Sequence, residues 1–188
     1  MRIYAILAHD KKDSLNGFIF NKVTEHLKNK KFDVDVMHLY DFADQIPFFV
    51  HDKNKTEQNS FFQENKKLFM DADRLLIVHP VYWYSLPGIL KCWVDLITNF
   101  AWKYESGKYA KALHKIKKAM VINTSMAPAW YRKFFTCNPA TTQMKENFRF
   151  FDIPKFYFYQ IGSVSKLDEN KVNLHIKKIL KIVDELVK

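Results

Sequence analysis

Glycine is scarce in this sequence, and its scarcity excludes the best-known nucleotide-binding loops. The glycines are only Gly17, Gly88, Gly107 and Gly162. Neither G-x-G-x-x-G nor G-x-x-x-x-G-K-[ST] can be formed from glycines so far apart. A nucleotide phosphate would therefore have to be held by a loop of another kind.

Cysteine is rarer still, because the chain has only Cys92 and Cys137. Two distant cysteines give no disulfide framework, and no His, Cys or Asp cluster has the spacing of a metal site. We predict no metal and a cytoplasmic location. The sequence also has no apolar run near the roughly 18 residues of a membrane helix. The apolar N-terminal stretch is too short for a signal peptide and is interpreted as a first strand.

Acidic residues are fewer than basic ones, which leaves a formal net charge of +10. The lysines are scattered, form no long basic run and do not alternate with aromatics as in single-strand binders. This pattern favours a solvated lysine-rich surface over a nucleic-acid site. Apolar residues make up 48% of the chain, so disorder is not expected. The 188 residues suit a single domain, predicted over residues 1–188.

Apolar periodicity predicts alternating strands and helices. The expected strands are Arg2–His9, Asp33–Leu39, Asp73–Pro80, Lys118–Thr124 and Lys155–Gly162. The expected helices are Ser14–Lys28, Phe61–Asp71, Leu86–Ile97, Pro139–Phe150 and Val172–Val187, and Tyr40–Asn59 is interpreted as a long loop. Right-handed crossovers between such units predict an α/β fold with a doubly wound, five-stranded parallel sheet and helices on both faces.

Ligands of such sheets bind beyond the carboxyl ends of the strands, so the segment after the first strand is a candidate site. His9 closes that strand, and Ser14, Leu15 and Asn16 begin the following helix. The unpaired N–H groups and the positive dipole end of a helix start favour an anion. An ordinary helix cap, with a structural His9, is the alternative.

The segment after the third strand is rich in aromatics. Pro80, Val81, Tyr82, Trp83 and Tyr84 follow one another there. Aromatic faces at a strand end can stack on a planar heterocycle, or they can plug the sheet or form a dimer contact. We expect Ser85 to cap the next helix and Pro87 to lie in its first turn.

The fourth strand ends in small polar residues, where backbone donors can approach a ligand. These candidates are Asn123, Thr124, Ser125, Met126 and Ala127. A plain turn before Pro128 is the alternative. Each of the three segments is a weak signal alone, but three neighbouring strand ends together predict one binding edge.

These segments resemble the flavodoxin-like NAD(P)H:quinone oxidoreductases, a family that includes ancillary subunits of glutathione-gated potassium efflux systems. One shared element is H-x4-S-x-N, formed by His9, Ser14 and Asn16. The stretch from Pro80 to Asp95 is close to the most specific family motif, and it is matched by Pro80, Trp83, Pro87, Leu90, Lys91, Trp93 and Asp95.

The chain also departs from the family pattern. His9–Asp10 stands where the family often has His-Pro, and Thr124–Ser125–Met126–Ala127 stands where it often has T-T-G-G. The missing glycines bear on how closely the backbone approaches a ring, and they leave a degenerate, flavin-free domain as one reading.

The resemblance implies a flavin site. The loop from His9 to Asn16 would hold the flavin phosphate and ribityl chain, and Val81–Tyr84 would line the isoalloxazine. Asn123–Ala127 would contact its other edge, with Trp83 and Tyr84 walling the pocket where nicotinamide and then the acceptor stack. FMN is preferred over FAD because no adenine pocket is identifiable, although Tyr40–Asn59 could provide one.

The implied activity is hydride transfer from NAD(P)H through FMN to a quinone or similar flat acceptor, by a ping-pong mechanism. Tyr131 is the candidate catalytic proton donor. The resemblance also implies a homodimer, in which the aromatics Trp102, Tyr104, Trp130 and Phe134, expected to be exposed, lie at the interface or pocket. A flavin-binding regulatory subunit that contacts a potassium efflux transporter is the alternative function.

Overall fold

The computed structural model describes residues 1–48, 56–104 and 111–188. Its central sheet has five parallel strands in the order β2-β1-β3-β6-β7. Their bounds are β1 (Arg2–Leu7), β2 (Asp33–His38), β3 (Arg74–Pro80), β6 (Lys118–Thr124) and β7 (Lys155–Ile161). This order confirms the predicted doubly wound α/β fold. From β1 the chain first adds β2 on one side of the sheet and then adds β3, β6 and β7 on the other, so the topological switch point lies between β1 and β3.

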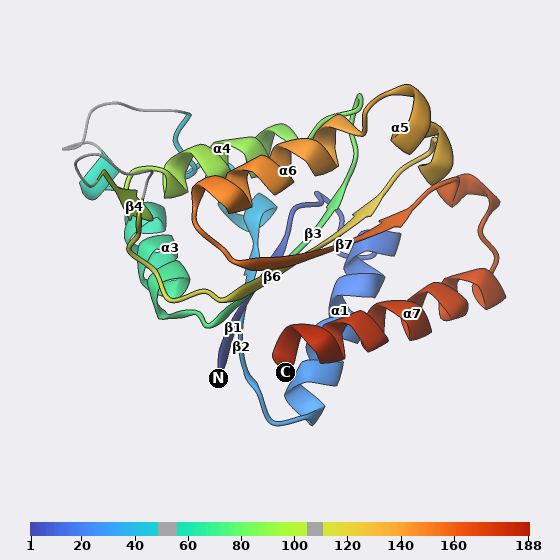
Figure 1. The fold of residues 1–188 in the computed structure, drawn as a ribbon, viewed down its shortest axis with the longest axis horizontal. Coiled ribbons are helices and arrows are strands. Elements are labelled where there is room, and N and C mark those ends of the chain that lie inside the picture. Colours follow the sequence, from blue (N-terminus) through green and yellow to red (C-terminus); the bar gives the residue numbers. More distant parts are fainter. Residues whose placement is uncertain (49–55, 105–110) are drawn as a thin grey trace.

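Helices cover both faces of the sheet (Figure 1). One face carries α1 (Leu15–Asn29) and α7 (Glu169–Val187). The other carries α3 (Ser60–Asp71), α4 (Gly88–Ile97) and α6 (Pro139–Phe150). The sheet is thus the middle of three layers.

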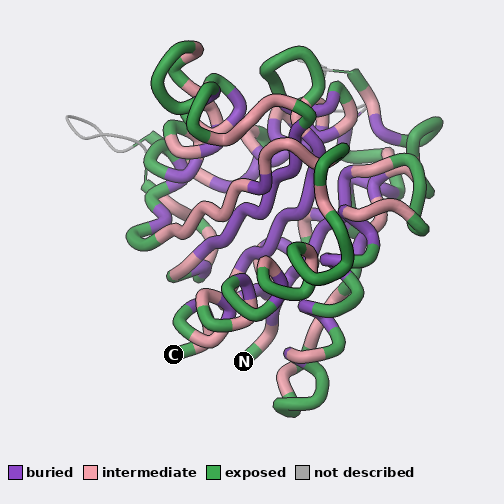
Figure 2. Tube along the Cα trace, turned by 90° about the vertical axis from the view of Figure 1, so that its right-hand side faces the viewer, coloured by how far each residue is buried: buried purple, intermediate pink, exposed green. Residues whose placement is uncertain are grey.

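The strand β1 shows why the sheet is buried on both sides. Its residues alternate between two cores, because successive side chains of a strand point to opposite faces. Ile3, Ala5 and Leu7 pack with α1 and α7, whereas Tyr4 and Ile6 pack with α3 and α4. Figure 2 shows the buried strands running through the centre of the molecule. The continuous apolar run of this strand therefore reflects burial on both faces.

Several smaller elements were not predicted. They are α5 (Ala129–Phe135), the antiparallel pair β4 (Trp102–Lys103) and β5 (Lys111–Ala112), and the short turns η1 (Leu39–Phe42) and η2 (Val164–Lys166). Each has seven residues or fewer, which is too short for a repeating apolar pattern to be recognised in the sequence. The expected loop Tyr40–Asn59 lies partly outside the described residues.

Two predictions about single residues were wrong. Ser85 does not cap α4, since Pro87 occupies the N-cap position and makes no side-chain cap bond. Trp102 is half-buried rather than exposed, because its ring packs edge-on against Tyr104 and Phe150. Within the described ranges, no helix is long and apolar enough to cross a membrane.

Candidate functional site

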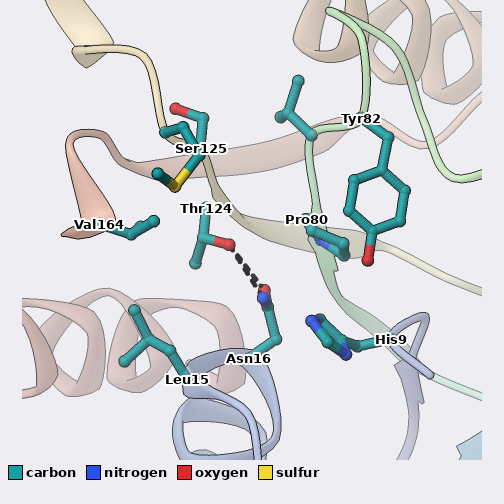
Figure 3. Close-up of a pocket in the computed structure, with 10 residues that line it drawn as sticks. His9, Leu15, Asn16, Pro80, Tyr82, Thr124, Ser125 and Val164 are labelled. Carbon is teal, nitrogen blue, oxygen red and sulfur yellow. Dashed lines mark hydrogen bonds between the residues drawn. The ribbon is translucent and has the colours of Figure 1, made fainter. Parts of the chain in front are cut away.

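The carboxyl ends of β1, β3 and β6 enclose a cavity of about 260 Å³, named here the first hollow. Figure 3 shows its lining side chains arranged around a common space. They come from the loop after β1, the start of α1, the ends of β3 and β6, and η2, and they are His9, Leu15, Asn16, Pro80, Val81, Tyr82, Thr124, Ser125, Met126 and Val164.

The start of α1 forms one side of the first hollow. Ser14 caps the helix, and its Oγ accepts a hydrogen bond from the Gly17 N–H at 3.2 Å. No described residue accepts a hydrogen bond from the N–H groups of Leu15 and Asn16. The two groups remain available to an anion at the positive end of the helix.

Gly17 lets the loop fold closely over this helix start. A Cβ atom at Gly17 would lie only 1.9 Å from the carbonyl oxygen of Lys12, so no other residue fits without a backbone shift. His9 braces the same loop, because its Nδ1 lies 3.0 Å from the Lys11 nitrogen and accepts its hydrogen bond. The loop is therefore fixed by packing rather than by a glycine-rich sequence.

A buried hydrogen bond joins α1 to β6. Asn16 Nδ2 donates to Thr124 Oγ1 at 2.9 Å, as the dashed line in Figure 3 shows. Both residues are almost fully buried, at 3% and 4% exposure. Asn16 thus uses one amide hydrogen to fix the spacing of the two elements, and the other remains for a ligand.

A second, wider cavity of about 520 Å³ lies next to the first and is named the second hollow. The two share Val81, Tyr82, Ser125 and Met126. The further lining residues of the second hollow are Trp83, Tyr84, Ala127 and Arg132. Because the two hollows share these four residues, they lie side by side between the helix start and the aromatic segment.

The aromatic segment folds as a tight turn in an unfavourable backbone conformation. Tyr82 and Ser85 exchange two backbone hydrogen bonds, at 3.1 and 2.9 Å, and this pairing explains why Ser85 is not a helix cap. Between them, Trp83 and Tyr84 have φ angles of 46° and 65°. Positive φ is costly for bulky side chains and is found where surroundings or function maintain it.

Backbone hydrogen bonds narrow the set of donors available to a ligand. The N–H groups of Val81 and Ser125 bond to the carbonyls of Thr124 and Ile161, and that of Tyr82 bonds to Ser85. Within the segments 81–84 and 125–127, the N–H groups with no partner among the described residues are those of Trp83, Tyr84, Met126 and Ala127. These four backbone donors remain free for a ligand.

Arg132 is the cation of the site, although the sequence analysis missed it. The residue is 1% exposed and lines the second hollow. Its guanidinium donates to the side-chain oxygens of Asn123 at 3.1 Å, Asn138 at 3.4 Å and Gln160 at 3.5 Å. All three acceptors are neutral amides. Burial lowers the pKa of Arg132, but an arginine stays charged in a protein.

His79 lies fully buried beside this arginine, at the end of β3. Its Nδ1 is 2.7 Å from the Pro80 carbonyl oxygen, and its Nε2 has no partner among the described residues. Burial lowers the pKa of His79 to about 4, and the charge of Arg132 adds to the effect. His79 is therefore neutral at pH 7 and structural.

The structure brings most of the predicted binding residues together. The two hollows are lined by His9, Leu15, Asn16, Pro80, Val81, Tyr82, Trp83, Tyr84, Thr124, Ser125, Met126 and Ala127. Ser14 and Asn123 line neither hollow; they support it, as helix cap and as acceptor for Arg132.

Tyr131 does not line either hollow. Its ring stacks on Phe135, with centroids 5.5 Å apart and planes 13° apart. Helix α5 turns Arg132 inward, so the neighbouring residue points about 100° away. The sequence missed this short helix and therefore missed Arg132. The stretch after Pro128 was the available signal, because proline often precedes the first turn of a helix.

The lining residues fit an anionic, flat ligand. Neither hollow is lined by an aspartate or glutamate, and Arg132 is charged. The free N–H groups of α1 suit a phosphate, and the aromatic segment suits a planar ring. Among the described residues, no group of three or more His, Cys, Asp or Glu side chains is arranged to hold a metal.

A family model described as the flavodoxin-like fold matches residues 1–183. The chain belongs to this flavodoxin-like family. The match covers nearly the whole flavodoxin-like chain and agrees with its strand order. In doubly wound sheets the switch point is the usual place for a ligand, and here β1 and β3 flank it, with β6 next to β3.

Curated relatives of this flavodoxin-like protein include oxidoreductases. It is 29% identical over 107 residues to the Bacillus subtilis protein named uncharacterized NAD(P)H oxidoreductase YrkL. The match covers 57% of this chain and 53% of that relative. The chain thus spans about half the length of the curated relatives that it matches.

Solved structures share the fold of this flavodoxin-like protein. An FMN-dependent NADH-azoreductase from Bacillus anthracis, in complex with FMN, matches with a TM-score of 0.82 and 19% identity, over 100% of both chains. The NAD(P)H:quinone oxidoreductase from Methanothermobacter marburgensis matches with a TM-score of 0.79 and 16% identity, over 97% of this chain and 94% of its own.

Proposed function

We propose that this protein is an FMN-dependent NAD(P)H oxidoreductase that passes hydride from NAD(P)H to a quinone or similar flat acceptor. The observation that carries the proposal is the pair of adjacent hollows, with a helix start at one end and an aromatic turn at the other. The oxidoreductase names of the relative and of both solved structures support it.

The first hollow would hold the phosphate and the ribityl chain. The N–H groups of Leu15 and Asn16 point from the positive end of α1, and the His9 and Asn16 side chains provide further polar contacts. The hydrogen bond between Asn16 and Thr124 keeps these donors in place before the ligand arrives, which lowers the entropic cost of binding.

The second hollow would hold the ring. It is lined by Trp83, Tyr84, Met126 and Ala127, whose N–H groups have no partner among the described residues, and by aromatic side chains. Bound FMN supplies the hydride chemistry, which no side chain of this site can provide alone. The protein would hold the edge of the ring, leave one face of the ring open and exclude water from the other face.

The same open face would accept first the nicotinamide and then the acceptor, so the two cannot bind together. Tyr82, Trp83 and Tyr84 provide the stacking surfaces that bring each partner into short range. Because the nicotinamide and the acceptor would use the same binding place in turn, we predict ping-pong kinetics. The proton-donor role of Tyr131 stays a prediction. Tyr131 is not among the residues that line either hollow.

Reconstitution with FMN tests the proposal. We expect the purified protein to bind FMN, to lose the yellow colour when NADH or NADPH is added without oxygen, and to regain it with a quinone. Steady-state rates at several acceptor concentrations should give parallel double-reciprocal lines. A protein that binds no FMN would contradict the proposal, and intersecting lines would contradict the ping-pong order.

We also propose a homodimer. Trp83, Trp130, Phe134 and Phe135 are each at least 60% exposed, near the second hollow or on α5 beside it. Exposed apolar side chains on this scale mark an interaction surface. Light scattering after gel filtration tests the proposal, and Phe134→Lys should shift a dimer to the monomer. A monomeric wild-type protein would refute it.

Other expectations stay predictions. FAD would need an adenine site, and the loop expected to provide one includes residues 49–55, which lie outside the described part. A peripheral contact with a potassium efflux transporter, the cytoplasmic location and the single domain over residues 1–188 also stay predictions.

A further inference from the structure

Arg132 is unusual among buried arginines because its partners carry no charge. Its guanidinium meets only the amide oxygens of Asn123, Asn138 and Gln160, at 3.1 to 3.5 Å. Its Nε has no partner among the described residues. A buried charge normally requires an ion pair and full hydrogen bonding, because desolvation is costly.

The neighbouring groups do not supply the missing negative charge. His79, whose pKa the charge of Arg132 helps to lower, is neutral at pH 7. The side chains that line either hollow include no carboxylate. No described carboxylate forms a salt bridge with Arg132. The positive charge is therefore left uncompensated at the wall of a cavity that can admit a ligand.

The polar network beneath Arg132 holds it against that wall. Asn123 accepts from Arg132 and donates to Thr141 Oγ1 at 3.3 Å, and Gln160 donates to the same oxygen at 2.7 Å. These contacts come from β6, β7 and α6, so three elements fix the position of the guanidinium. A fixed charge with no counter-ion needs little reorganisation to stabilise an anion.

We propose that Arg132 makes the site bind reduced FMN, whose ring carries a negative charge at neutral pH, more tightly than oxidised FMN, whose ring is neutral. The inference rests on the proposed function and adds to it the residue that sets the balance between the two oxidation states. Charge placed near the ring is one of the means by which a protein tunes a flavin.

The test compares the affinity for oxidised and reduced FMN. The dissociation constant of oxidised FMN is measured by fluorescence, and the midpoint potentials of bound and free FMN give the ratio for the reduced form. Arg132→Gln should lower the preference for reduced FMN at least tenfold, which makes the potential of a two-electron couple about 30 mV more negative. Arg132→Lys, which keeps the charge, should retain most of the preference.

Two further variants separate charge from folding. Asn123→Asp places a carboxylate beside the guanidinium, at a position where the present contact is 3.1 Å, and neutralises the charge while keeping the arginine paired. It should lower the preference as Arg132→Gln does, and it keeps the test open if Arg132→Gln fails to fold. Lys133→Gln removes an exposed charge from the next position of α5 and should change nothing.

The outcomes are distinct. Wild-type protein that binds no FMN would overturn the proposed function and this inference together. Wild-type protein that binds FMN, with an unchanged preference in Arg132→Gln or in Asn123→Asp, would overturn the inference alone. An equal loss in Arg132→Lys and Arg132→Gln would also overturn it, because the shape of the side chain rather than its charge would then be responsible.

Discussion

The first hollow and the second hollow are built in opposite ways. The first is held by a helix cap, a buried hydrogen bond and the close approach at Gly17. The second is lined by a turn with two positive φ angles and by Trp83, which is 95% exposed. The comparison indicates that the first end is ready for a ligand, whereas the second carries strain and exposed apolar surface that a ligand or a second chain can cover.

The strongest test of the preformed end is Gly17→Ala. The added Cβ meets backbone at 1.9 Å, so the loop or the helix start must move, and we expect a loss of about 3 kcal/mol of unfolding free energy. FMN affinity should fall at least tenfold. Urea denaturation and FMN titration measure the two effects.

Gly88→Ala is the matched control for this substitution. Nothing lies within 4 Å of a Cβ at Gly88, at the start of α4, so alanine should leave stability unchanged or raise it by about 0.5 kcal/mol. Equal stability and FMN affinity in the two variants would show that the close approach at Gly17 is unimportant.

Stability should depend on pH through His79, which lines neither hollow but is buried beside Arg132 of the second. Its folded pKa of about 4 lies below the ordinary value of 6.5, so the unfolded chain binds the proton more readily between these values. This contribution to stability is complete above pH 6.5 and is lost as the pH falls towards 4. It should amount to about 2 kcal/mol between pH 7 and pH 5.

Urea denaturation at pH 7, 6 and 5 measures this dependence in wild-type protein and in His79→Gln. The variant should lose less stability than the wild type as the pH falls, whatever its stability at pH 7. Parallel pH profiles would show that His79 does not contribute.

The hydrogen bond between Asn16 and Thr124 should give a smaller effect. A double-mutant cycle with Asn16→Ala and Thr124→Ala should show a coupling of about 1 kcal/mol in unfolding free energy. Either single substitution already removes the buried hydrogen bond, so the double variant does not lose it a second time. Additive losses would mean that the two residues act separately and that the preformed end is less rigid than described.

The smallest expected effect concerns strain in the aromatic turn. Trp83→Asn should raise the unfolding free energy of the protein without FMN by about 0.5 kcal/mol, since asparagine tolerates a positive φ and the exposed ring loses few contacts. The same change should weaken FMN binding. If stability and affinity fall together, Trp83 supports the fold and the contrast between the two hollows fails.

The strands and long helices could be predicted because their signals are local. β6 and α6 have the predicted bounds, and each of the other predicted strands and helices differs by one to three residues at an end. Ser85 was misjudged because a serine before Pro87 looks like a cap, whereas its backbone pairs with Tyr82. That pairing depends on two unfavourable φ angles, which no residue preference at Trp83 or Tyr84 indicates.

By itself, the sequence determined the parallel sheet, the three strand ends that meet at its edge and the resemblance to a flavin-binding family, because apolar periodicity and motif spacing are properties of neighbouring residues. The tertiary structure alone decided that Arg132, and not Tyr131, reaches the second hollow, and that no carboxylate accompanies it. Whether a charge is buried, and which groups surround it, depends on elements far apart in the chain, here β6, β7, the middle of α5 and the start of α6.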